Sequence, residues 1–70
     1  MTEEEIYATR DLAVIWGITP QQVPRWATLA AVNGDGAADL AIRLSGQCSW
    51  EDAKPKLAVG VAERVEEAMK

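Results

Sequence analysis

The chain has 70 residues, 49% of them hydrophobic, and a formal net charge of −4 at pH 7. This length allows a single domain with one small core. The single cysteine, Cys48, excludes an internal disulfide bond. Without histidine, a glycine-rich phosphate loop or a cluster of metal ligands, the sequence predicts a non-enzymatic protein with no metal site and no cofactor.

A first helix is predicted from Thr9 to about Trp16, because threonine is a frequent helix N-cap. Gly17 ends it, since glycine readily adopts the left-handed conformation that closes a helix. Residues 6–8 form either a short strand remnant or the end of a turn capped by residues 2 and 5. Apolar residues at spacings of three and four predict the buried face of this first helix: Leu12, Ile15 and Trp16.

A second helix is predicted to start in the segment Thr19, Pro20, Gln21 and Gln22. Threonine caps helices, proline is favoured at the first helical position, and glutamine three residues after the cap completes a capping box. Pro24 conflicts with this start, because an interior proline costs a regular helix about 3 kcal/mol. The helix therefore begins near Val23 or is kinked at Pro24. Its predicted buried residues are Val23, Trp26, Ala27 and Ala30.

A third helix is predicted from roughly Ala37 to Leu44, after the loop Asn-Gly-Asp-Gly at residues 33–36. Leu40 and Leu44 lie on one stripe of this helix, Ile42 lies off it, and Gly46 stops it.

A last helical stretch is predicted to begin at Ser49, which can act as a cap with Asp52 three residues later. Pro55 restarts the helix and leaves residues 50–53 as a separate turn. Helical spacing relates Leu57, Val61, Arg64 or Val65, and Ala68. We therefore expect one all-α domain over residues 1–70, with four or five short helices. A helix-turn-helix-like unit spans about residues 9–30, and C-terminal helices span about residues 37–69.

A helix-turn-helix pattern is carried by residues that such a unit buries: Ala13, Gly17, Ile18, Val23 and Trp26. The segment 6–27 resembles the opening of MerR-like and excisionase-like domains and of phage terminase small subunits. The shared features are a Tyr-x-Thr entry, Leu-Ala, a glycine followed by Ile and Thr, and Val-x-x-Trp. The matched positions are mainly buried ones, so the resemblance bears on fold more than on function.

The resemblance implies a DNA-binding accessory or regulatory protein as one hypothesis. Its contacts to duplex DNA would come from Arg10, Gln21, Gln22, Arg25 and Thr28. Two departures oppose it: no clear wing, the arginine-rich β-hairpin of those families, follows the second helix, and the chain has only seven Lys and Arg residues. Duplex binding commonly involves about 6 to 10 phosphate contacts. A homodimer would double the cations available.

The leading hypothesis is a small acidic interaction protein of the kind found in phages and mobile elements. It would bind and regulate or inhibit a host or phage protein, including one that itself binds nucleic acid. The predicted contact residues are Glu3, Glu4, Glu5, Trp50, Glu51 and Asp52. Trp50 belongs to no apolar stripe, and a partly exposed aromatic side chain is a typical contact anchor. Trp16 and Trp26 are predicted to be core residues.

No apolar run approaches the roughly 20 residues that span a bilayer. The N-terminal segment carries Glu3, Glu4 and Glu5 where a signal peptide would carry basic residues. We therefore expect a cytoplasmic protein with no membrane contact.

Overall fold

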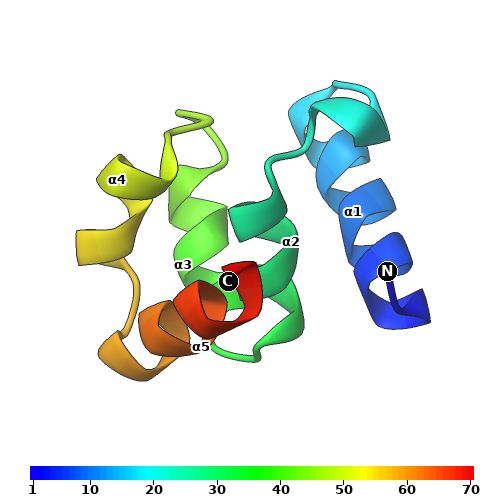
Figure 1. The fold of residues 1–70 in the computed structure, drawn as a ribbon. Helices are drawn as coiled ribbons and strands as arrows, with labels where there is room; N and C mark the ends of the chain where they lie inside the picture. The colour runs from blue at the N-terminus through cyan, green and yellow to red at the C-terminus, as the bar shows by residue number, and fades with distance from the viewer.

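The computed structural model describes residues 1–70 and is all-α, as the sequence predicts. It contains five α-helices and two 3-10 turns and no strand. Figure 1 shows α2 in the middle of the molecule, with α1 on one side and α3, α4 and α5 on the other. The elements are α1 (Glu3–Trp16), η1 (Pro20–Gln22), α2 (Arg25–Val32), α3 (Gly36–Arg43), α4 (Trp50–Ala53), η2 (Lys54–Lys56) and α5 (Val59–Met69).

The first helix, α1, begins about two turns before the predicted cap Thr9, and that prediction is wrong. Thr2 is the cap: its hydroxyl accepts the Glu5 N–H at 3.2 Å, and the Glu5 carboxylate accepts the Thr2 N–H at 3.1 Å. The first-turn glutamates suit the positive end of the helix dipole, and no Gly or Pro interrupts residues 3–16. The alternative of a strand remnant at residues 6–8 is therefore also wrong.

The end of α1 is as predicted. Gly17 lies in the left-handed region, with φ 69° and ψ 34°, and its backbone N–H caps the last turn of the helix. Leu12 is buried and Trp16 is half-buried, but Ile15 is 60% exposed, against the prediction that it faces the core. The packed face of α1 is narrower than its apolar pattern because α1 contacts α2 and η1 and is open on its outer side (Figure 1).

The second helix is interrupted at Pro24. Thr19 donates its N–H to the side-chain oxygen of Gln22 at 3.0 Å, and this supports only the single turn η1. Val23 and Pro24 are extended, with ψ of 122° and 142°, and α2 begins at Arg25. Proline has no N–H to donate and disfavours helical geometry in the residue before it. Of the two predicted outcomes, the structure therefore has the late start.

The core is centred on α2, which packs against α1, α3 and α5. Trp26, Ala27, Leu29 and Ala30 are all buried in it. Gly36, the first residue of α3, is also buried against α2. A Cβ atom at this position would overlap the carbonyl oxygen of Ala30 and lie 3.0 Å from Val61. The small residues Ala30 and Gly36 therefore let α2 and α3 approach each other closely.

The C-terminal half follows the predicted pattern closely. In α3, Leu40 is buried and Ile42 is 65% exposed. The Ser49 hydroxyl caps α4 by accepting the Asp52 N–H at 3.4 Å, and Pro55 lies in η2. In and before α5 the buried residues are Leu57, Val61, Ala62 and Val65. Ala68 lies on an exposed position near the end of α5, so the buried stripe stops earlier than its spacing predicts.

Candidate interaction groove

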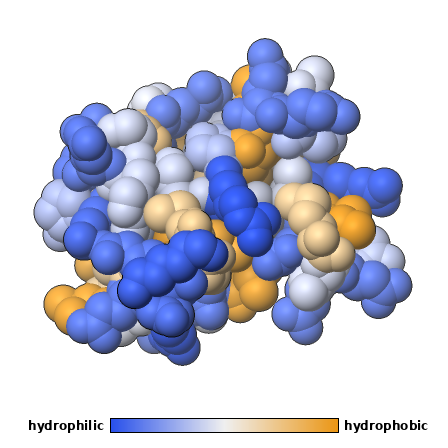
Figure 2. Space-filling view, in the orientation of Figure 1, coloured by the Kyte–Doolittle hydropathy of each residue, from blue (hydrophilic) through white to orange (hydrophobic).

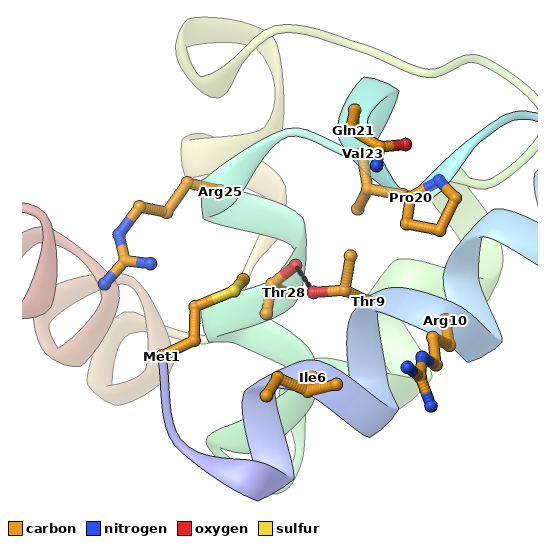
Figure 3. Close-up of a pocket in the computed structure, with 9 residues that line it drawn as sticks. All are labelled: Met1, Ile6, Thr9, Arg10, Pro20, Gln21, Val23, Arg25 and Thr28. Carbon is orange, nitrogen blue, oxygen red and sulfur yellow. Dashed lines mark hydrogen bonds between the residues drawn. The ribbon is translucent and has the colours of Figure 1, made fainter.

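A groove of about 430 Å³ lies between α1 and the segment formed by η1 and the start of α2. Figure 3 shows the elements from which its residues come, with Arg10 and Arg25 extending away from the threonine pair at its centre. Nine residues line it: Met1, Ile6, Thr9, Arg10, Pro20, Gln21, Val23, Arg25 and Thr28. The break at Pro24 shapes this groove, because it directs η1 away from the axis of α2 and leaves Val23 between them.

The floor of the groove contains an ordered pair of threonines, Thr9 and Thr28. Their hydroxyl oxygens are 2.9 Å apart, and the Thr9 hydroxyl also lies 2.7 Å from the Glu5 carbonyl oxygen. A carbonyl only accepts, so Thr9 gives its one proton to Glu5 and Thr28 must donate to Thr9. Both hydroxyls are therefore engaged within the chain (Figure 3).

The prediction that Thr28 is an exposed contact residue is wrong. Its side chain is 1% exposed, because α2 begins at Arg25 and turns residue 28 towards α1. Its hydroxyl bonds to Thr9 and is not presented to a ligand. Thr28 therefore lies beneath the floor of the groove and presents almost no surface to a ligand.

The border of the groove carries Arg10, Gln21 and Arg25. In Figure 3 the two guanidinium groups lie on different sides of the groove, Arg10 on α1 and Arg25 at the start of α2. The chain contains two ion pairs, Lys54 with Glu66 and Lys70 with Glu67. Neither arginine at the groove takes part in an ion pair, so both positive charges are available to a ligand.

Gln22 is exposed next to the groove but does not line it. Its side-chain oxygen accepts the Thr19 N–H and stabilises η1, so it has a local structural role. The structure thus brings Arg10, Gln21, Arg25 and Thr28 together around one groove, with Thr28 buried beneath the others.

The acidic residues of the leading hypothesis form two separate groups. Glu3, Glu4 and Glu5 form the first turn of α1, whereas Glu51 and Asp52 belong to α4. Figure 1 shows the first turn of α1 and α4 on opposite sides of the molecule. Two of these carboxylates are engaged locally, since Glu5 accepts the Thr2 N–H and Asp52 accepts the Ser49 hydroxyl. One contact surface therefore does not include both groups.

Trp50 is half-buried at the start of α4 and packs against the core. Its ring centroid lies 6.2 Å from that of Trp26, with the rings tilted by 44°. Aromatic pairs at this separation stabilise a core beyond the area they bury. Trp26 is buried and Trp16 half-buried in the same cluster, as predicted for core residues.

The apolar part of the groove was missed from the sequence. Met1, Ile6, Pro20 and Val23 supply it, together with the methyl groups of the two threonines. Because the sequence predicts a strand stub or a turn at Ile6, it does not indicate that Ile6 shares a helix face with Thr9 and Arg10, three and four residues later. On the face drawn in Figure 2, apolar residues gather over the start of α1 and separately over α5, with hydrophilic residues between them.

No family model matches the chain, and no curated protein or solved structure is significantly similar to it. No helix is both long enough and apolar enough to cross a membrane. Acidic and cysteine side chains do not gather in groups of three or more that could hold a metal ion. A second pocket, of about 450 Å³, lies between η2 and α5, and the cation that lines it, Lys54, is paired with Glu66.

Proposed function

We propose that this chain is a non-enzymatic protein-binding module that regulates or inhibits a host or phage protein through the groove between α1 and α2. One observation carries the proposal: an open groove with an apolar floor is bordered by two arginines that have no ion-pair partner in the chain. Concave apolar sites with a few polar groups at the border are typical of recognition sites.

The interruption at Pro24 favours a protein partner over duplex DNA. A reading helix presents its contact residues on one face of a continuous rod in the major groove. Here Gln21 lies on η1, Arg25 begins α2, and the extended residues between them separate the two. The side chains that would read bases therefore do not share a helix face.

The charge distribution also favours a protein partner. The net charge is −4, and of the seven cations two are used in ion pairs with glutamates. Only two cations, Arg10 and Arg25, border the groove. Duplex binding commonly involves about 6 to 10 phosphate contacts, which is more than two side chains supply.

A site-specific crosslinking experiment tests the proposal. A photoreactive side chain at Gln21, on the border of the groove, is expected to form a single major protein adduct in cells of the natural host. The same group at Ala68, an exposed position on α5, is the matched control and is expected to give none. If neither position gives a protein adduct, or if both give the same mixture, the proposal is wrong.

A second candidate function is DNA binding, and one specific observation favours it. Arg10, Gln21 and Arg25, all members of the predicted DNA-contacting set, border the same groove. If this candidate is correct, the pure protein retards a duplex at low ionic strength, Arg25→Ala weakens the complex, and affinity falls steeply as salt rises. Failure to retard any duplex at low salt excludes it.

A further inference from the structure

We infer that the groove binds an extended acidic segment of a partner protein, with one aliphatic side chain on the groove floor and carboxylates at Arg10 and Arg25. This inference rests on the proposed function and names the chemistry of its partner. Three features of the groove carry it: the composition of the floor, the unpaired charges at the border and the absence of aromatic rings from its walls.

The floor is apolar although two threonines form part of it. Thr28 donates to Thr9 and Thr9 donates to the Glu5 carbonyl, so both hydroxyl protons are used inside the chain. Both threonines are buried, so the accessible floor is formed mainly by the aliphatic side chains of Ile6 and Val23 (Figure 3). A polar side chain on this floor would lose its water without gaining a hydrogen bond, whereas an aliphatic side chain buries apolar area favourably.

The border requires negative charge in the ligand. Arg10 and Arg25 are exposed, have no hydrogen-bond or ion-pair partner in the chain, and lie on different sides of the groove. A guanidinium group pairs with a carboxylate through two parallel hydrogen bonds. A segment with one aliphatic residue between two acidic residues therefore matches the groove. The aliphatic side chain would lie on the apolar floor, and the two carboxylates would pair with Arg10 and Arg25.

The walls of the groove favour an acidic peptide over a nucleic acid, although both ligands are negatively charged. They consist of aliphatic, proline and threonine residues and contain no aromatic ring. Single-stranded nucleic acids bind largely by stacking their bases on aromatic side chains. Trp26 and Trp50 pack against each other in the core, and the exposed Tyr7 does not line the groove.

A display library of random short peptides, selected against the immobilised protein, tests this inference directly. We expect the enriched sequences to share one aliphatic residue with Asp or Glu on both sides. The doubly substituted variant Arg10→Glu with Arg25→Glu is expected to bind a synthetic consensus peptide at least about tenfold more weakly, equivalent to about 1.4 kcal/mol. Replacing the aliphatic residue of that peptide by serine is expected to weaken binding to a similar extent.

The matched control carries Lys56→Glu and Arg64→Glu. Both residues are exposed, lie on η2 and α5 outside the groove, and give the same change in net charge. This control is expected to retain the parent affinity for the consensus peptide. Equal weakening by both double variants would mean that only overall charge matters, and it would overturn the inference.

The outcomes separate this inference from the proposed function. If crosslinking at Gln21 captures a protein, but selection yields a basic consensus or none, the protein-binding function stands and the acidic partner is wrong. The same conclusion follows if the Arg10 and Arg25 double variant captures that protein as well as the parent does. If duplex DNA is bound and no protein is captured, both proposals fail.

Discussion

Two segments of this protein use the same local arrangement and differ in what surrounds it. In each, a 3-10 turn containing a proline is followed by an extended residue and then by a longer helix: η1 precedes α2, and η2 precedes α5. The extended residues are Val23, with ψ 122°, and Leu57, with ψ 152°. Neither α2 nor α5 has a side-chain cap on its first turn.

Tertiary contacts tie the second segment to α3 and α5. Leu57 is buried in the core, the Ala58 N–H donates to the Asp39 carboxylate of α3 at 3.2 Å, and Lys54 pairs with Glu66 of α5. The first segment lacks such ties on its outer side. Val23 is half-buried, Pro24 has no N–H to donate, and Arg25 has no acidic partner.

The difference shows where the chain leaves its own interactions incomplete. At η2 the local break is tied to α3 and α5 by a hydrogen bond and an ion pair, whereas at η1 the neighbouring arginine has no ion-pair partner. A pocket of about 450 Å³ also lies at η2 and the start of α5, but its Lys54 is paired with Glu66, whereas Arg10 and Arg25 at the first groove have no ion-pair partner. Substitutions in both segments can test this contrast.

The largest expected effect comes from Gly36→Ala, because Gly36 of α3 packs against both α2 and α5, the helices that follow the two segments. The added Cβ overlaps the Ala30 carbonyl oxygen, a backbone atom that cannot rotate away. We expect the free energy of unfolding, measured with chemical denaturant, to fall by about 3 kcal/mol. Gly60→Ala in α5 is the control: nothing lies near its Cβ, and alanine favours helix, so a gain of about 0.5 kcal/mol is expected. Equal effects at both positions would contradict the close crossing of α2 and α3.

The next effect compares the two extended residues directly. Leu57→Ala removes a buried side chain and leaves a cavity, so we expect a loss of about 3 kcal/mol in unfolding free energy. Val23→Ala removes a half-buried side chain from the groove floor and should cost about 1 kcal/mol. Denaturant unfolding of both variants measures the difference. A larger loss at Val23 would show that the first segment, and not the second, is the closed one.

The threonine pair beneath the groove gives a third, asymmetric prediction. Thr9→Val leaves the buried Thr28 hydroxyl without the acceptor it uses in the structure, at a cost of about 2 kcal/mol. Thr28→Val leaves the bond from Thr9 to the Glu5 carbonyl intact and should cost about 1 kcal/mol. In a double-mutant cycle, the two losses are expected to add to more than the loss of the double variant. The reverse order of the single variants would contradict the assigned direction of donation.

The smallest effects compare the polar groups of the two segments. Asp39→Ala removes the acceptor for the Ala58 N–H and is expected to cost about 1 kcal/mol in unfolding free energy. Arg25→Ala removes a side chain with no partner in the chain and should change stability by less than about 0.5 kcal/mol. A thermal or chemical unfolding curve shifted as much by Arg25→Ala as by Asp39→Ala would mean that Arg25 has a structural role, and it would weaken the case for a free border cation.

The sequence alone determined the helical class, most helix ends and most of the core. Gly17, Ser49 and Pro55 act where predicted because capping and chain-breaking depend on the conformation of one or two residues. Trp26 and Leu40 are buried because helical periodicity reports directly which side of a helix meets the core. The predicted cap of α1, Thr9, lies seven residues after the observed cap, Thr2, because two good caps compete locally and only the complete helix distinguishes them.

Only the tertiary structure decided the groove. Its apolar residues come from α1 and from both sides of the Pro24 break, so no single stretch of sequence contains the pattern. The burial of Thr28 and the exposure of Ile15 depend on which face of α1 meets α2, and an amphipathic pattern does not specify the width of that contact. Local conformation follows from neighbouring residues, whereas a binding surface depends on how helices distant in sequence are packed.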